Sequence, residues 1–490
     1  MTIAAPPVDD IAALATGGRT NVIGFWLRLA ARIPFLFIAG RVYGPEDLGR
    51  MAYAILIVEF AAQLATMGLR RGLALQLSRD DSIATHEVWD ALLTVFIVSI
   101  PATILLILLP KTMFPNSAVE GFESLLPLAI FPIAAADVML AALAYRYDIK
   151  ASVRARAIIE PWTISIGAGL FALVSLRHGL LMAYGLSIAA AFFAAMVPFV
   201  RSYGLPWGWR PAPVRVITLA RRNLPIAGAE AIEWATRRID LAILGLFVSP
   251  ATVGIYYVAQ QITSLPQKLK TSFDPVLGPV IARKLEAGDK AAVAKQISQV
   301  GFWILAAQAG GALSLGLPGQ GVLGIVGPNF PLGNGALAFL LLAEVAAAAA
   351  VVSEAALIYI ASWRNLFVSL VMIAVQAALS FALILSIRSY GYNEYYQAVG
   401  PAAALAIAMA IGSMIKTRLA GHLLGSTVAV WRWPLIFATV AAGIVGGIST
   451  LGPEWVEIII GIPLILITYG WIIWNKGFGE EDRVLFKKAV

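Results

Sequence analysis

Two arginines inside an apolar segment are the first residues whose placement points to chemistry. In "NVIGFWLRLAARIPFLFIAG", residues 21–40, Arg28 and Arg32 stand four residues apart, so both fall on one face of a helix. If that helix crosses a bilayer from Asn21, Arg32 lies about 16 Å deep, where a guanidinium that faces lipid costs about 2.5 kcal/mol or more. We therefore expect Arg32 to face a water-filled cavity or a partner. Arg28 is shallow enough either to share that site or to reach the membrane interface.

A second apolar segment carries both acids and bases. In "GAEAIEWATRRIDLAILG", residues 228–245, the side chains of Glu230, Glu233 and Arg237 fall near one helix face. Glu233 and Arg237 have the four-residue spacing of a helical ion pair. Two interpretations are open: a salt-bridge network that neutralises itself, or the wall of a polar cavity.

Isolated carboxylates stand in further apolar segments. Asp137, Glu344 and Glu354 are each surrounded by apolar residues. Acids inside a membrane serve in ion coupling or pair with arginine. Both roles are open for these three residues, as they are for Glu230 and Glu233.

Other charges lie near the ends of apolar segments. Lys268 and Lys270 close the segment 252–272 and could bind an anionic head group that enters from the cytoplasm. The alternative is ordinary loop charge of the kind that sets membrane orientation. Glu160 lies near the end of the segment 157–176, where we expect an interfacial anchor.

The sequence lacks the residues and motifs that several kinds of site require. The chain has no cysteine and only three histidines, which are far apart, so a cysteine or histidine metal site is not expected. The sequence contains no phosphate loop of the form G-x-x-x-x-G-K-[ST], no H-E-x-x-H and no G-x-S-x-G. We expect a protein that is not an enzyme, with no catalytic residue, no metal and no cofactor. A coupling ion, H+ or Na+, is left open.

The elements that must position these charges are membrane helices. The 490 residues are 60% hydrophobic and 13% charged, whereas soluble proteins are about 45–50% apolar and about 25% charged. We predict an all-α polytopic membrane protein with about fourteen apolar segments near the length that spans a bilayer. They are residues 21–40, 48–67, 88–109, 122–144, 157–176, 180–200, 223–247, 252–272, 294–316, 334–361, 366–386, 397–415, 433–451 and 455–474.

The positive charges orient these segments. With the N-terminus in the cytoplasm and alternating sides, 27 of the 36 Lys and Arg residues fall on the cytoplasmic side and five on the other. This asymmetry is the positive-inside pattern. The net charge of +8 therefore reflects topology, and we do not expect a nucleic-acid partner.

An internal repeat relates the two halves of the chain. "GRVYGPEDLGRMAYA", residues 40–54, and "GLFVSPATVGIYYVA", residues 245–259, share Gly, Pro, Gly and Ala at an offset of 205. Both stretches suit a tight turn between the first two helices of a bundle, where Pro begins a helix. Six helices per copy gives both copies the same orientation, and hence a pseudo-twofold axis along the membrane normal. The offset pairs Arg32 with Arg237; a chance Pro/Gly turn is the alternative.

This repeat predicts the following organisation. A cytoplasmic tail precedes an N-lobe of helices 1–6, a proline-rich cytoplasmic linker whose prolines discourage continuous helix, a C-lobe of helices 7–12, and a last pair of helices. The boundaries are residues 1–20, 21–200, 201–222, 223–415, and 416–490 for helices 13–14 with a cytoplasmic tail.

Two stretches carry a family resemblance. "AGRVYGPEDLGRMAYAILIVEFAAQLATMGLRRGLALQLSR", residues 39–79, resembles the amino-terminal signature of polysaccharide flippases in the multidrug/oligosaccharidyl-lipid/polysaccharide exporter superfamily. "VSPATVGIYYVAQQITSLP", with "GPVIARKLEAGDK" beyond it, resembles the helix 7–8 region of that family. The fourteen-helix arrangement extends the resemblance over the whole chain.

The resemblance implies a fold and a transport cycle. It implies two six-helix lobes around a central cavity, and translocation of an oligosaccharide linked to undecaprenyl pyrophosphate from the cytoplasmic to the periplasmic leaflet. The cationic cavity of the family maps onto Arg28, Arg32 and Arg237, which would hold the pyrophosphate by charge-assisted hydrogen bonds. Glu230 and Glu233 depart from that pattern and would cancel part of the positive charge.

The leading expectation is therefore a flippase of the bacterial inner membrane, with both termini cytoplasmic, that serves surface polysaccharide or lipopolysaccharide synthesis. Its expected partners are the lipid-linked oligosaccharide, membrane lipids and the polysaccharide polymerase machinery. The alternative is a cation-coupled exporter of drugs or small amphiphiles, with Glu233 and Asp137 as coupling sites. A membrane-embedded glycan transferase is less favoured, because the external connections are short and hold no clustered catalytic pair.

Overall fold

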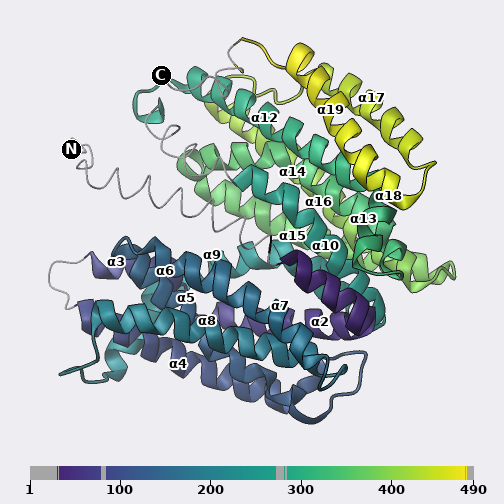
Figure 1. The fold of residues 1–490 in the computed structure, drawn as a ribbon. Helices are drawn as coiled ribbons and strands as arrows, with labels where there is room; N and C mark the ends of the chain where they lie inside the picture. Colours follow the sequence, from purple (N-terminus) through teal and green to yellow (C-terminus); the bar gives the residue numbers. More distant parts are fainter. Residues whose placement is uncertain are drawn as a thin grey trace. The chain divides into compact units, whose positions relative to one another are not determined.

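The computed structural model describes residue 30 and residues 32–78, 84–271, 281, 284–480 and 482. All secondary structure in these ranges is helical, and none of these residues lies in a strand (Figure 1). The predicted all-α class is confirmed. The chain divides into two compact units, Met1–Arg238 and Ile239–Val490. The division falls inside a helix, beyond the start of the predicted C-lobe at residue 223.

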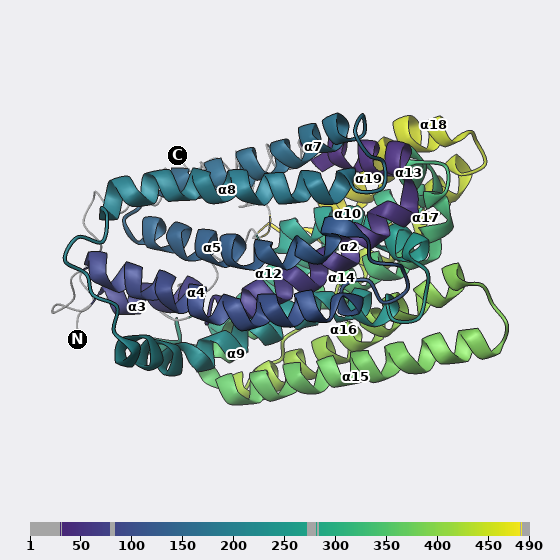
Figure 2. The same cartoon turned by 90° about the horizontal axis from the view of Figure 1, so that it is seen from below.

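The first unit is a bundle of long helices that lie side by side (Figure 2). The central helix is α5 (Ile130–Tyr145), which is largely apolar except for Asp137 and contacts α2, α3, α4 and α8. The other elements are residues 32–38, η1 (Ala39–Tyr43), α2 (Gly44–Ala65), α3 (Leu69–Leu77), α4 (Ala84–Leu108), η2 (Pro110–Thr112), η3 (Gly121–Ala129), α6 (Ile149–Val153), η4 (Arg154–Ile159), α7 (Glu160–Phe171), α8 (Gly179–Tyr203) and most of α9 (Pro213–Leu244).

The second unit has its core where α14 (Asn334–Ile360) packs against α12 and α16. The remaining elements are α10 (Pro250–Thr271), α12 (Lys290–Gly316), α13 (Gly319–Val326), η5 (Phe330–Gly333), α15 (Ser362–Ser389), α16 (Glu394–Leu424), α17 (Pro434–Ser449), α18 (Glu454–Val456), η6 (Glu457–Gly461), α19 (Ile462–Ile472) and η7 (Ile473–Gly477). Helices α17 and α19 pack on each other and on α12.

Long apolar helices make this chain a multi-pass membrane protein. Eight helices in the described ranges are long and apolar enough to cross a membrane, and a ninth joins them if α12 and α13, bent by 68°, count as one span. Helix is present in each of the fourteen predicted segments, in the first at residue 30 and from residue 32 onward. Helix α9 is not among the eight, because its central turns carry Glu230, Glu233 and Arg237. The number fourteen stays a prediction.

The order of elements supports the internal repeat. Helices α2 and α10 each contain 22 residues and have Pro45 and Pro250, respectively, in their first turn. A short η element precedes α5 in the first unit, and another precedes α14 in the second. The turn before α2 is tighter than expected, because η1 runs directly into Gly44. The φ of Gly44 is +82°, a left-handed value that a glycine adopts without steric cost.

The segment between α8 and α9 is shorter than the predicted linker 201–222. Helix α8 continues to Tyr203, and α9 begins at Pro213. The proline does not prevent helix here, since proline is tolerated in the first turn, where its missing N–H has no helical partner. Asp90 on α4 fixes the segment: it accepts a hydrogen bond from Trp209 Nε1 at 2.8 Å and pairs with Arg215 Nε at 2.9 Å.

The end of the described chain is fastened to α12. The carboxylate of Asp482 accepts hydrogen bonds from Arg432 Nη1 at 2.5 Å, Trp303 Nε1 at 2.8 Å and the Gly479 amide at 2.9 Å. Burial raises the pKa of Asp482, but the hydrogen bonds from these groups and from Gln299 outweigh it and lower that pKa to about 2. The described residues that follow α19 are thereby held against α12.

Candidate functional site

Polar side chains from α2, α3 and α9 meet in the first unit around Glu230. The Glu230 side chain is only 1% exposed. Its Oε2 accepts a hydrogen bond from Gln63 Nε2 at 2.9 Å. Its Oε1 lies 3.4 Å from Arg71 Nε and 3.6 Å from Arg70 Nε. A buried carboxylate requires such partners, because an unpaired charge in this setting is strongly destabilising.

Glu233, one helical turn further along α9, has a different environment. Its side chain is 44% exposed, and its two oxygens contact two arginines: Arg71 Nη2 at 2.9 Å and Arg237 Nη2 at 3.3 Å. Both arginine side chains are about half exposed. We call the whole group the α3–α9 cluster; it consists of Gln63, Arg70, Arg71, Glu230, Glu233 and Arg237. Three arginines against two glutamates leave it with one net positive charge.

Two glycines bring α3 and α9 close enough for these contacts. Gly68 precedes α3 with a φ of +70°, and a Cβ added to it would lie 2.6 Å from the backbone nitrogen of Ala227. A Cβ on Gly72 would lie 1.8 Å from Asn223 Oδ1. Small residues four apart allow helix backbones to approach in this way. The approach sets Arg70 and Arg71, which lie between the glycines, beside the glutamates of α9.

The structure places three of the predicted site residues in the cluster. Glu230, Glu233 and Arg237 are part of the ionic network, and its further members come from another helix. Arg32 is partly buried in the helical residues 32–38. Arg28 lies outside the described residues, and the joint action of Arg28, Arg32 and Arg237 stays a prediction. Lys268 and Lys270 belong to the end of α10, and their side chains fall outside the described part.

Arg70 and Arg71 are cluster residues that sequence reasoning missed. The positive-inside pattern places them among the cytoplasmic charges, whereas the structure pairs Arg70 with Glu230, and Arg71 with both Glu230 and Glu233. The signal available in the sequence was "GLRRG", a pair of arginines between two glycines at the spacing that permits close helix approach.

Asp137 also has an arginine partner in the first unit. Arg156 Nη2 on η4 contacts its carboxylate, and Arg156 Nη1 lies 2.6 Å from Glu160 Oε2. One guanidinium therefore serves two acids, and all three side chains are largely buried. Of the two roles open for Asp137, the geometry favours charge pairing. The interfacial-anchor prediction does not describe Glu160, whose carboxylate is bound by Arg156.

The predicted carboxylates of the second unit are partnered as well. Glu344 accepts a hydrogen bond from Gln267 Nε2 at 3.1 Å. Glu354 pairs with Lys416 Nζ at 3.0 Å and accepts a hydrogen bond from Asn365 Nδ2 at 3.3 Å. Of the two roles open for Glu354, the geometry favours charge pairing, with Lys416 as its partner.

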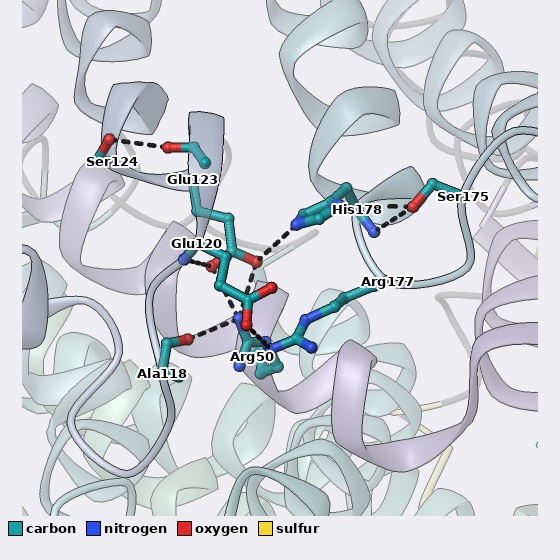
Figure 3. A network of polar contacts seen from close by, with 9 residues as sticks. Arg50, Ala118, Glu120, Glu123, Ser124, Ser175, Arg177 and His178 are labelled. Atoms are coloured by element: carbon teal, nitrogen blue, oxygen red, sulfur yellow. Dashed lines mark hydrogen bonds and ion pairs between the residues drawn. The ribbon is translucent and has the colours of Figure 1, made fainter.

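A second ionic network joins α2 to η3 and to the start of α8 (Figure 3). Arg50 Nη2 lies 2.8 Å from both oxygens of Glu123, and the two side chains are 5% and 0% exposed. His178 Nε2 lies 3.8 Å from Glu123 Oε1. Arg177 pairs with Glu120 at 2.9 Å, with both side chains about half exposed. The buried Arg50–Glu123 pair connects two segments that are 73 residues apart in the sequence.

Comparison with known proteins identifies the family of this chain. The family described as "Polysaccharide biosynthesis protein" matches residues 38–304. A relative, the succinoglycan biosynthesis transport protein ExoT of Rhizobium meliloti (strain 1021), is 24% identical over 305 residues. That match spans 58% of this chain and 57% of the relative, so it covers less than two thirds of the relative's length.

Solved structures share the fold. One described as the lipid II flippase MurJ in an inward closed conformation superposes with a TM-score of 0.70 at 13% identity, over 96% of this chain and 99% of that chain. An inward-facing multidrug resistance MATE family transporter of the MOP superfamily gives a TM-score of 0.63 at 14% identity, over 81% and 94%. Identities this low establish the fold alone.

Proposed function

Because this chain belongs to the polysaccharide biosynthesis protein family, we propose that it is a flippase for a lipid-linked oligosaccharide. The substrate is carried on undecaprenyl diphosphate and moves from the cytoplasmic to the periplasmic leaflet of the bacterial inner membrane. Both chain termini are cytoplasmic in this proposal, and the product serves surface polysaccharide or lipopolysaccharide synthesis through polymerase machinery on the far side.

The α3–α9 cluster carries this proposal. Its charge is positive, and the guanidinium groups of Arg71 and Arg237 are half exposed around a single half-exposed carboxylate. A guanidinium presents several N–H donors in a planar fork that matches phosphate oxygens in pairs. Two such groups from neighbouring helices suit the adjacent phosphates of a diphosphate. A site for an uncharged drug would not need them.

The other predicted cations extend this site along the transport path. Lys268 and Lys270 are proposed to meet the head group at the cytoplasmic side, and Arg28 and Arg32 to hold it further along. The polyprenyl tail stays in lipid, and rocking of the two halves gives alternating access, as in transporters built from repeats.

The arginine partners of Glu233 and Asp137 provide evidence on the runner-up function, a cation-coupled exporter. Its coupling sites were Glu233 and Asp137, and each is bound by arginine. A carboxylate whose charge is balanced by a neighbouring guanidinium has less need of a bound cation. We therefore propose charge pairing for both residues, and propose that a coupling ion, H+ or Na+, acts elsewhere if one is used.

Transport in vesicles tests the proposed function. Purified protein is reconstituted with a defined undecaprenyl-diphosphate oligosaccharide, and the glycan that reaches the opposite leaflet is counted over time, with and without H+ or Na+ gradients. We expect transport above protein-free vesicles, and its abolition by Arg32→Ala at equal abundance. Ion-driven dye efflux without any oligosaccharide transport would contradict the proposal and favour the exporter.

A further inference from the structure

The two glutamates of the α3–α9 cluster are bound by overlapping arginines but differ in exposure. Glu230 is 1% exposed and is held by Gln63, Arg70 and Arg71. Glu233 is 44% exposed, and its partners Arg71 and Arg237 are 54% and 50% exposed. Ion pairs this exposed contribute little to stability where water reaches them. Glu233 can therefore leave its arginines at low cost, whereas Glu230 cannot.

The two contacts of Arg71 allow it to release Glu233 while it stays beside Glu230. Its Nη2 contacts Glu233, and its Nε faces Glu230. When Glu233 moves away, the Nη end of Arg71 becomes free, and its Nε end stays fixed beside the buried carboxylate. Arg237 loses Glu233 in the same step. Two guanidinium ends, from α3 and α9, are then open to another anion.

A site with exposed arginines in a membrane must distinguish its substrate from the anionic phospholipids around it. Bilayers contain anionic phospholipids whose phosphodiester carries one negative charge, and an open pair of arginines would attract them. Glu233 supplies an internal anion with that same single charge. A phosphodiester that displaces it exchanges one charge for another, with no net gain. A diphosphate diester carries two charges and can contact both arginines at once.

We propose that Glu233 is a specificity-determining residue: its carboxylate occupies Arg71 and Arg237, is displaced by a diphosphate head group, and is not displaced by a singly charged phosphodiester. This inference rests on the proposed function, because it assigns the diphosphate of the transported lipid to this cluster. The inference explains why an acidic residue, Glu233, lies in a site of net positive charge. It also predicts selectivity for diphosphate over monophosphate lipids without any contact to the sugar.

A matched pair of ligands tests the inference directly. N-acetylglucosamine linked to farnesol through a diphosphate and the same compound linked through a monophosphate differ by one phosphate. Binding of each is measured on the full chain in nanodiscs of neutral phosphatidylcholine. We expect the unmodified protein to prefer the diphosphate by about tenfold, and Glu233→Gln to reduce that preference to about twofold by tightening monophosphate binding. Glu286→Gln, a change at an exposed glutamate of the second unit, should keep the original preference.

A second measurement separates selectivity from folding. Phosphatidylglycerol added to the nanodiscs should compete with the diphosphate ligand in Glu233→Gln and leave the unmodified protein unaffected. Thermal unfolding of the variant should match that of Glu286→Gln. An unchanged preference in Glu233→Gln, or an equal loss of both ligands, would overturn this inference and leave the flippase proposal standing. Failure of the unmodified protein to bind the diphosphate ligand would overturn the flippase proposal and the inference together.

Discussion

Arg71 Nη2 lies 2.9 Å from Glu233 Oε2, an ion pair between residues 162 positions apart. The pair connects α3 to α9 at the point where Gly68 and Gly72 let the two helices meet. It also joins the buried and the exposed parts of the α3–α9 cluster, since the Nε of the same arginine faces Glu230.

Replacing Arg71 should reduce transport more than replacing Arg237. Arg71→Ala removes an anion contact and also a partner of buried Glu230, whereas Arg237→Ala removes only the first. We expect the initial rate of oligosaccharide transport to fall at least about tenfold for Arg71→Ala, the effect of one lost charge-assisted hydrogen bond. Arg71→Lys should restore little of the transport rate, because an ammonium group cannot contact two acids at once as a guanidinium does. A normal rate for Arg71→Ala, with exposed Arg201→Ala as the control, would remove Arg71 from the site.

The two glutamates should differ in what they contribute to stability. Glu230→Gln leaves Arg70 and Arg71 without their buried counter-charge, and we expect the free energy of unfolding to fall by about 1–3 kcal/mol. Glu233→Gln breaks only exposed pairs, worth about 0–1 kcal/mol. Thermal unfolding of the two variants in the same detergent measures the difference. Equal effects would mean that the burial difference between these side chains does not determine their energetic roles.

The approach of α3 to α9 should depend on its glycines. Gly68→Ala combines a left-handed φ with a Cβ only 2.6 Å from backbone, and Gly72→Ala forces the buried Asn223 amide to move. Both should lower the unfolding temperature and the transport rate. Gly228→Ala in α9 is the matched control, because a Cβ there meets no atom within 4 Å, and alanine in a helix gains up to about 1 kcal/mol over glycine. Tolerance of Gly68→Ala would contradict the close approach.

The Arg50–Glu123 pair should stabilise the first unit far more than Arg177–Glu120. Removing one member of the buried pair, as in Arg50→Ala, leaves an uncompensated charge and is expected to lower the free energy of unfolding by about 3–5 kcal/mol. Arg177→Ala affects a half-exposed pair and should change it by less than about 1 kcal/mol. The double change Arg50→Met with Glu123→Leu should recover much of the loss. A double variant as unstable as Arg50→Ala would show that packing, and not charge, is at stake.

The contribution of Asp482 should depend on pH in one direction. Its pKa in the folded chain, about 2, lies below the ordinary value of 3.8. Its stabilising effect is therefore complete above about pH 4 and is lost as the pH falls toward 2. Asp482→Asn should lower the unfolding temperature at pH 7, and the gap to the unmodified protein should narrow from pH 4 downward. A gap that stays constant to pH 2 would argue against a charged Asp482 in the folded state.

Features set by local sequence could be predicted well. Apolar segments of bilayer length located the helices, and the Pro and Gly positions around residues 45 and 250 indicated the repeat that the order of elements supports. The four-residue spacing of Glu233 and Arg237 predicted an ion pair that the structure contains. These features depend on periodicity and on neighbours along the chain, which a single sequence displays.

Contacts between distant segments could not be predicted in the same way. The positive-inside pattern places Arg70, Arg71 and Lys416 on the cytoplasmic side without indicating a partner, because Glu233 lies 162 residues from Arg71 and Glu354 lies 62 residues from Lys416. For Asp137 the partner Arg156 is only 19 residues distant, yet no helical spacing links them. Which of several acids an arginine meets depends on helix packing, and small residues such as Gly68 and Gly72 decide that packing.

The most direct test of the central claim is the transport rate of a variant that lacks both exposed arginines of the cluster. Arg71→Ala combined with Arg237→Ala is reconstituted in vesicles beside the unmodified protein and Arg201→Ala, at equal abundance and with the same undecaprenyl-diphosphate oligosaccharide. We predict that the double variant folds and carries no measurable oligosaccharide, while Arg201→Ala transports normally. Transport by the double variant at the unmodified rate would contradict the assignment of the diphosphate to the α3–α9 cluster.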